Sequence, residues 1–457
     1  MSETVLRTPA PGRLFTRPAT AASCAGFVLI GMLQALYGPA VPGLRAEFGL
    51  SPAGAGLGLS LHFTGGVAGV LAFNAIHSRI SNRTLLAASY GLMALGAAGF
   101  ALAPGWPLAL AAAFLAGLGF GGIDYGLNQL FAVGFGNRST AMLNVLNAHF
   151  GIGAVLGPVV VAWLGRDSYT YAFGACAVLA TLLVVAGSNG VRTPVNGGES
   201  VSLTPATGGE PEPVSHTPAT VAEAVTRGPA TRAEPGPGIP VTDAEPRSGT
   251  PVTDAEPIHG TTETFAEAVP GKARLGLPRI LLGFLALYVL NVAVEAGVGG
   301  WEPTHLETVG YSATVAASAT SVYWLMMTAG RFLVVPVALR YSPERILTVC
   351  AAGMTVCLLL APAKGLAPVA YAGVGLFIAP VFPTGLPWLN RALPQARRAG
   401  AWVIAASMAG GVAAPPLLGV GIEAWGIHAV PWLLTALSAA SLAATVRLIQ
   451  LTRRSVE

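Results

Sequence analysis

Residues 107–135 read PLALAAAFLAGLGFGGIDYGLNQLFAVGF, and Asp124 is the only charged residue among them. An α-helix needs about 20 mainly apolar residues to cross the ~30 Å hydrocarbon core of a bilayer. The stretch is long and apolar enough for this, so it predicts a membrane-spanning helix. An acid at membrane depth is costly and marks a functional position by default.

The composition of the whole chain is also that of a membrane protein. Of its 457 residues, 53% are hydrophobic and only 10% are charged, whereas soluble domains carry roughly 25% charged residues. The 58 glycines suit helices that pack closely in lipid through small side chains. The four cysteines lie in apolar stretches without zinc-site spacing, so we expect no disulfide, metal or other cofactor.

Similar apolar stretches recur along the chain in two sets of six, separated by residues 189–275. The expected helices cover 20–43, 53–77, 84–103, 107–135, 140–164 and 169–188, then 278–301, 313–339, 345–362, 366–390, 398–421 and 428–450. The sequence therefore predicts an all-α membrane protein with 12 transmembrane helices in two six-helix bundles, residues 1–188 and 276–457.

The basic residues predict how the chain is oriented. Loops with excess Lys and Arg stay cytoplasmic. With both termini inside, 21 basic residues are cytoplasmic and three are outside, namely Arg45, Arg166 and Lys364. We expect a multi-pass protein of the cell (plasma) membrane with cytoplasmic termini. A signal peptide is the alternative for the first segment, but its apolar run is too long and many spans follow it.

Residues 189–275 are rich in Pro, Gly, Thr and Glu and contain a short duplication, PVTDAEP at 240–246 and again at 251–257. Such a composition cannot bury enough apolar surface to offset chain entropy, which predicts a disordered cytoplasmic linker. A regulatory or partner-binding segment is the alternative.

The two sets of helices also resemble each other. AGLGF at 116–120 returns as AGVGL at 372–376, and GAVLGP at 153–158 returns as GVAAPP at 411–416. Transporters are often built from such repeats, with the substrate site near the bilayer midplane. Prolines inside the spans predict bending elements; they are Pro39, Pro42, Pro158, Pro380, Pro383, Pro387, Pro415 and Pro416.

Taken together, these features resemble the major facilitator superfamily and, within it, the fucose permease-like sugar:proton symporter group. The stretches that carry the resemblance are GGIDYGLNQ (121–129), LNVLNAHFGIGAVLGP (143–158), EAGVGGWEPTHL (295–306), SVYWLMMTAGR (321–331) and GLFIAPVFPT (375–384). The resemblance implies the major facilitator fold and proton-coupled transport. The chain departs from the pattern at residues 76–79, where the loop lacks its acid, and at Gly38, which aligns with the group's helix-1 acid.

Asp124 is the first candidate for proton coupling. Asn128 lies four residues on, so both side chains face the same way on a helix, and Gln129 is beside it. The resemblance implies a carboxylate that couples proton movement at this position. A structural, hydrogen-bonded acid is the alternative.

Glu295 repeats the arrangement in the second half, with Asn291 one turn before it. We expect Glu295 to act in proton coupling or substrate binding. Glu302 and Glu307 lie near the outer boundary of the same span, where we expect them to be solvated.

Amides and aromatic residues are the candidates for substrate binding. Amides both donate and accept hydrogen bonds, as hydroxyl-rich ligands require, and aromatic rings can stack on a sugar. The candidates are Gln34, Tyr37, Asn128, Gln129, Asn144, Asn147, Asn291, Tyr323, Trp324 and Trp388. The alternatives are interhelical hydrogen bonds for the amides and interfacial anchoring for the rings. We expect His62 and His149 to be structural and Trp163, Trp301 and Trp425 to be interfacial.

These features favour secondary active transport by alternating access. The chain has no nucleotide-binding loop, which favours a proton gradient as the drive. Neutral amides and no basic residue at midplane, with Arg331 expected at the cytoplasmic gate, favour a sugar or other small polar metabolite. Proton-driven efflux of a drug or secondary metabolite is the alternative.

We expect a monomer in the lipid bilayer that binds a small molecule and protons but no nucleic acid. A membrane enzyme or a non-transporting sensor is disfavoured, because neither a catalytic constellation nor a folded central segment is evident.

Overall fold

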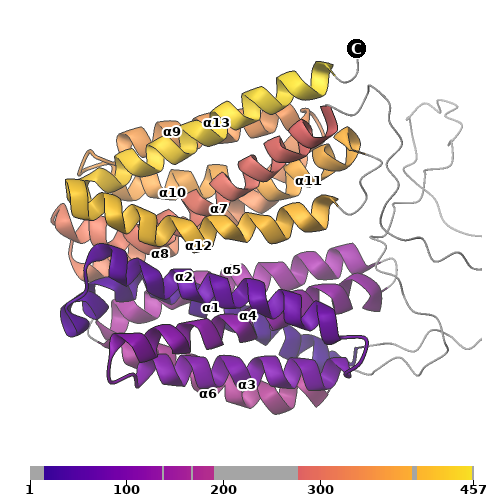
Figure 1. Ribbon diagram of the computed structural model, residues 1–457, viewed down its shortest axis with the longest axis vertical. Helices are drawn as coiled ribbons and strands as arrows, with labels where there is room; N and C mark the ends of the chain where they lie inside the picture. Colours follow the sequence, from indigo (N-terminus) through magenta and orange to yellow (C-terminus); the bar gives the residue numbers. More distant parts are fainter. Residues whose placement is uncertain (1–14, 136–137, 166–167, 190–275, 394–398, 455–457) are drawn as a thin grey trace, which may run out of the picture. The chain divides into compact units, whose positions relative to one another are not determined.

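A computed structural model describes residues 15–135, 138–165, 168–189, 276–393 and 399–454 (Figure 1). The first half contains six helices, which are α1 (Arg17–Phe48), α2 (Pro52–Ile76), α3 (Asn82–Ala101), α4 (Trp106–Gly134), α5 (Ser139–Leu164) and α6 (Tyr169–Asn189). The second half contains α7 (Gly276–Thr308), α8 (Ala313–Ala338), α9 (Pro343–Leu360), α10 (Ala367–Ile378), α11 (Val381–Ala392), α12 (Ala399–Trp425), the 3₁₀ turn η4 (Ile427–Ala429) and α13 (Val430–Arg454). The predicted linker, from residue 190 on, lies outside the described residues.

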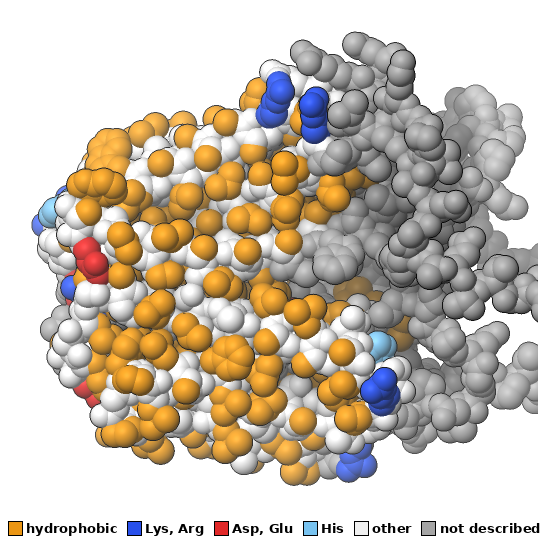
Figure 2. Space-filling view, in the orientation of Figure 1, with side chains coloured by type: hydrophobic (Ala, Val, Ile, Leu, Met, Phe, Trp, Pro, Cys, Tyr) orange, Lys and Arg blue, Asp and Glu red, His pale blue; other side chains and the backbone are white. Residues whose placement is uncertain are grey.

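The predicted fold class is confirmed. Eleven helical segments of the described chain are long and apolar enough to cross a membrane, with 367–392 counted as one. The 27-residue α12 is the twelfth helix. Figure 2 shows hydrophobic side chains over the middle of the visible face, with charged side chains at its two ends. This distribution suits a bilayer, because charge is costly in the hydrocarbon core.

Serine and proline define where several helices begin. Ser51 Oγ accepts a hydrogen bond from Gly54 N at 3.1 Å, and Ser81 and Ser312 cap α3 and α8 in the same way. These side chains satisfy amides that a first helical turn leaves without partners. The predicted span 366–390 is broken between α10 and α11, where Pro380 has no N–H to donate.

The two halves pack by the same scheme. In the first half α1 packs on α5, α2 on α4 and α3 on α6; in the second half α7 packs on α12, α8 on α10 and α9 on α13. Each pair in one half has its counterpart six spans later, which agrees with the repeat seen in the sequence.

The main contacts between the halves are those of α1 with α7, α2 with α12 and α5 with α8. We call the end where α13 finishes the terminal end (Figure 1) and the opposite end, where α1 ends and α2 begins, the distal end. The contacts of α2 with α12 and of α1 with α7 close the distal end, and we call them together the distal seam.

The distal seam uses backbone carbonyls that prolines leave free. Pro303 and Pro416 lie inside α7 and α12, so the carbonyls of Gly299 and Val412, four residues earlier, have no helical N–H partner. Ser60 Oγ of α2 donates to Val412 O at 2.5 Å. Gly299 O faces Gly38 of α1, where a Cβ atom would overlap it. The close approach of α1 and α7 explains why a side chain in place of Gly38 does not fit this state.

A polar contact completes the distal seam. Glu423 of α12 lies beyond the predicted end of its span and accepts a hydrogen bond from Ala53 N, in the first turn of α2, at 2.9 Å. A carboxylate is favoured there, because helix N-termini carry free N–H groups and a partial positive charge.

Substituting Gly38 should open the distal end. The added methyl of Gly38→Ala would meet Gly299 O, so we expect a cost of about 1–3 kcal/mol to the closed state. Spin labels at positions 102 and 425, whose native Leu and Trp are 80% and 71% exposed, should then report a longer distance. Gly91→Ala is the matched control, because a Cβ there meets nothing within 4 Å. Equal distances in both variants would contradict the role given to Gly38.

The contact of Glu423 should make closure of the distal end depend on pH. Hydrogen bonds from Ser51 and Ala53 N hold the pKa of Glu423 below its ordinary value. The contact therefore stabilises the closed state at neutral pH, and this stabilisation is lost as the pH falls through the lowered pKa. The distance between the two labels should lengthen on acidification in wild type. In Glu423→Ala the distance between the labels should be long at every pH. A pH response like that of wild type in this variant would refute the assignment.

Candidate functional site

A chain of polar side chains joins α4 to α5. Asn128 Nδ2 donates to Asp124 Oδ1 at 3.0 Å, and Asn147 Nδ2 donates to Asn128 Oδ1 at 3.2 Å. The shared face of Asp124 and Asn128, predicted from their spacing, is confirmed. All three side chains are half-buried, so the acid is held by amides and is not sealed in the core. We call these residues the Asp124 chain.

The same two amides also bond to their own helices. Asn128 Nδ2 reaches Asp124 O at 3.0 Å, and Asn147 Nδ2 reaches Leu143 O at 2.9 Å. These contacts fix both side chains in orientation. Asp124 thus accepts one hydrogen bond from a neutral, oriented amide, an arrangement in which it can hold or release a proton without losing its place.

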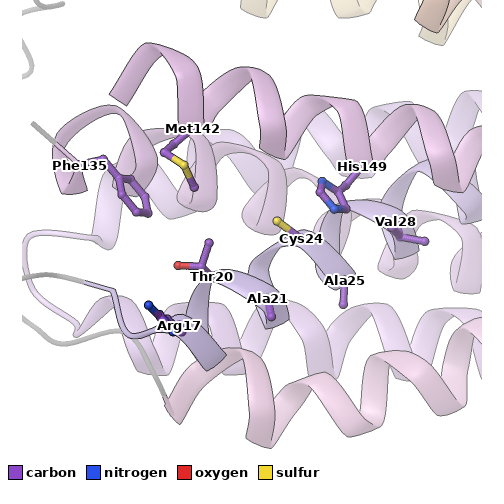
Figure 3. A pocket seen from close by; sticks show the side chains of 9 residues that line it. All are labelled: Arg17, Thr20, Ala21, Cys24, Ala25, Val28, Phe135, Met142 and His149. Carbon is purple, nitrogen blue, oxygen red and sulfur yellow. The ribbon is translucent and has the colours of Figure 1, made fainter. Parts of the chain in front are cut away.

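A cavity of about 570 Å³ lies at the terminal end between α1 and α5. Figure 3 shows Met142 and His149 of α5 opposite Thr20 and Cys24 of α1. The other lining residues are Arg17, Ala21, Ala25, Val28 and Phe135. His149 Nδ1 donates to Val145 O at 2.7 Å. The cavity is mostly apolar, with one cation at its mouth.

The second half holds a related group around Glu295 of α7. Glu295 is half-buried, and Asn291 one turn earlier is 1% exposed, with no hydrogen-bond partner for its Oδ1 among the described residues. Tyr323 OH of α8 donates to the backbone oxygen of Glu295 at 3.5 Å. Arg331 of α8 interacts electrostatically with Glu295 and Tyr323. The structure thus places Glu295 among the neighbours of Arg331, while the expected pairing of Arg331 with the loops or the second span at the cytoplasmic gate stays a prediction.

Other predicted substrate residues lie within the helix packing. Tyr37 is 2% exposed, and its hydroxyl lies 3.4 Å from His62 Nδ1. Trp388 of α11 packs edge-on against Phe284 at 5.0 Å between ring centroids. Trp324 is buried against Tyr323, with ring centroids 5.2 Å apart.

The remaining amides differ in burial. Gln34 is buried, Gln129 is half-buried and Asn144 is exposed. For all of these residues, contact with a substrate stays a prediction. The structure joins Asp124, Asn128 and Asn147 directly, and it brings Tyr323 to the backbone of Glu295.

One buried acid was missed by sequence reasoning. Glu302 is 0% exposed, so the prediction that it is solvated is wrong. The reason is that α7 continues to Thr308 and turns Trp301, also predicted at the interface, inward, where its Nε1 donates to Pro415 O at 3.1 Å. The spacing of Glu295 and Glu302, two helical turns apart, was the available signal. Trp163 and Trp425 are exposed, as expected.

Comparison with known proteins agrees with this architecture. A model of the Major Facilitator Superfamily matches residues 23–230 and 281–456. The chain belongs to the major facilitator superfamily. It is therefore a membrane transporter by family, and the superfamily part of the sequence prediction is confirmed.

Two curated relatives match part of this superfamily member. The cyanate transport protein CynX of Escherichia coli (strain K12) is 33% identical over 150 residues, which are 32% of this chain and 38% of the relative. The uncharacterized MFS-type transporter YfkL of Bacillus subtilis (strain 168) is 27% identical over 152 residues, 32% of this chain and 37% of the relative. The matched part of this chain thus covers less than two fifths of either relative.

Solved structures share the fold over most of the chain. A variant of the nucleoside transporter NupG has a TM-score of 0.68 at 12% identity, covering 94% of this chain and 100% of its own. A D-xylose-proton symporter has a TM-score of 0.65 at 13% identity, and the match covers 94% of this chain and 96% of the symporter. A variant of the fucose:proton symporter FucP of E. coli has a TM-score of 0.55 at 14% identity, and the match covers 94% of this chain and 98% of FucP. At these identities the likeness shows the fold alone, and membership of the fucose permease-like group stays a prediction.

Removing the central amide of the Asp124 chain should loosen the packing of α4 on α5. Asn128→Ala deletes a donor to Asp124 and an acceptor for Asn147. Because each such hydrogen bond contributes about 1 kcal/mol, we expect the purified protein to lose about 1–2 kcal/mol of stability, measured as a lower thermal midpoint in detergent. Thr181→Ala is the control, since Thr181 bonds only to Ala177 O of its own helix. A midpoint no lower than that of the control would contradict the interhelical role.

Proposed function

We propose that the protein is a secondary active transporter that moves a small polar solute by alternating access, coupled to protons through Asp124. The Asp124 chain is the observation that carries this proposal. It places a titratable carboxyl and two neutral amides on facing helices of one half. A carboxyl so placed can exchange a proton, while amides offer both donors and acceptors to hydroxyl or amide groups of a ligand.

The distal seam and the terminal cavity support one state of an alternating-access cycle. Hydrogen bonds close the distal end at Ser60 and Glu423, while a cavity of about 570 Å³ lies at the terminal end. The excess of basic residues in loops on the terminal side supports cytoplasmic termini in the plasma membrane. On that orientation the structure is the inward-facing state.

We extend the proposal to the domain plan and the assembly. Residues 1–188 and 276–457 form the two bundles, and residues 189–275 tether them in the cytoplasm. One chain carries both bundles, so we expect a monomer in the bilayer. Similarity to a D-xylose-proton symporter and a fucose:proton symporter in fold supports, without deciding, a sugar-like solute and symport.

Export of a drug or secondary metabolite is the second candidate. The observation that favours it is the apolar lining of the terminal cavity, where Phe135, Met142 and Val28 lie beside one cation, Arg17. The relative CynX is a cyanate transport protein, and Arg331 beside Glu295 would suit a small anion. The transport assay therefore includes sugars, nucleosides, cyanate and a drug panel.

Proton coupling should depend on Asp124. Purified protein in liposomes with an internal pH dye should show proton movement driven by one of these solutes. We expect Asp124→Asn to abolish this movement and to leave exchange of the same solute across the membrane measurable, because the amide keeps the shape of the carboxyl but cannot release a proton.

Glu47→Gln is the matched control for Asp124→Asn. Glu47 is an acid of the same half that bonds Tyr169 OH outside the Asp124 chain, so this variant should keep wild-type proton movement. Full proton movement in Asp124→Asn would refute coupling through Asp124. Solute-driven pH change with a drug alone, in the outward direction, would favour the second candidate.

A further inference from the structure

A second buried acid lies in the other half of the protein, away from the Asp124 chain. Glu302 of α7 is 0% exposed, and neither of its carboxyl oxygens has a hydrogen-bond partner among the described residues. His305, one turn further, is 1% exposed, and its Nδ1 lies 3.1 Å from Tyr371 OH of α10. The proposed function makes no use of these side chains.

The helices packed on α7 do not neutralise Glu302. Thr320 of α8 lies beside the carboxyl, but its hydroxyl donates to Ala316 O at 3.3 Å. Arg331 interacts with Glu295 and Tyr323 and not with Glu302.

The titratable groups nearest to Glu302 come from four elements. They are Glu295 and His305 of α7, Tyr323 of α8, Tyr371 of α10 and His428 of η4. A further titratable group comes from a fifth element, α1, because Tyr37 lines a small pocket together with Gly300 and Trp301 of α7 and Pro415 of α12.

An ionised carboxylate in this position would be strongly unfavourable. Moving a charge out of water without an opposite charge or hydrogen-bond donors costs several kcal/mol. Among the described residues, Glu302 has no opposite charge beside it, and its one neighbouring donor, the Thr320 hydroxyl, also bonds Ala316 O, so this packing favours the neutral, protonated form. A protonated carboxyl carries one O–H, and it is the proton that removes the cost of burial.

One contact of the distal seam lies one turn before Glu302 on α7. Trp301 before it bonds to Pro415 O of α12, and Pro303 after it frees Gly299 O, which faces Gly38 of α1. A path of polar groups leads from Glu302 toward the surface, because Tyr371 interacts with Glu302 and forms a hydrogen bond with His305.

The last step of this path is at the distal surface. His305 interacts with His428 of η4, whose side chain is exposed. The seam contact of Gly299 with Gly38 lies one turn from this acid, so the separation of α1 from α7 is the movement that we expect to admit water to it.

We propose that Glu302 is a second proton-binding site, which holds its proton while the distal seam is closed and exchanges it with distal water when the seam opens. The site deepens the proposed proton-coupled transport and rests on it for its role in the cycle. On this proposal each half has one acid that binds a transported proton. Asp124 is half-buried beside amides in the first half, and Glu302 is fully buried in the second.

Infrared spectroscopy of the full-length protein in nanodiscs tests the site without a substrate. At neutral pH, wild type should show the C=O stretch of a protonated carboxyl that is missing in Glu302→Gln and present in Glu295→Gln. In D₂O the band should shift slowly, because the proton is shielded. Gly38→Ala, which is expected to open the seam, should speed this exchange at least ten-fold.

Two results would overturn the proposal. An identical spectrum in wild type and Glu302→Gln would mean that Glu302 is not protonated, and equal exchange in wild type and Gly38→Ala would mean that the seam does not control access. If Glu302→Gln does not fold, ¹³C-glutamate labelling of Glu295→Gln decides, since the band must then shift with the label. No solute or gradient is used, so failure of transport coupling at Asp124 leaves this test intact.

Discussion

A bilayer offers no hydrogen-bond partner to the backbone, so each carbonyl that a proline frees inside a span must be covered by protein. In the second half, Pro303 and Pro416 free two such carbonyls. The first half covers them, one with the Ser60 hydroxyl and the other with the bare Cα of Gly38. The need to cover polar backbone in lipid thereby becomes the contact that closes one end of the molecule.

Access to the two buried acids follows from this contact. Asp124 lies in the first half and is half-buried, held by an amide that another helix orients. Glu302 is fully buried on α7, one turn beyond the seam contact of Gly299 with Gly38. The two carboxyls therefore differ in which movement of the halves would bring them to water. The two halves have equivalent helices, but their acids lie at different positions on those helices.

Hydropathy and charge predicted the fold because they depend on the composition of each span alone. The spacing of Asp124 and Asn128 likewise predicted their common face, since helix geometry fixes it. Asn147 was predicted as a polar site residue, but its bond to Asn128 depends on how α5 packs on α4. Glu302 was misplaced because hydropathy estimates depth along one helix and cannot show that side chains of α8 and α10 lie beside it. The interaction of Arg331 with Glu295 was not predicted for the same reason, because Glu295 belongs to another helix.

The distal seam is chemically one-sided. In the hydrogen bonds that cross it among the described residues, Ser51, Ala53 N and Ser60 Oγ of the first half donate, and Glu423 and Val412 O of the second half accept. Two copies of either half would bring donor to donor or acceptor to acceptor along this surface. The chemistry of this surface therefore favours pairing of one half with the other over pairing of two identical halves.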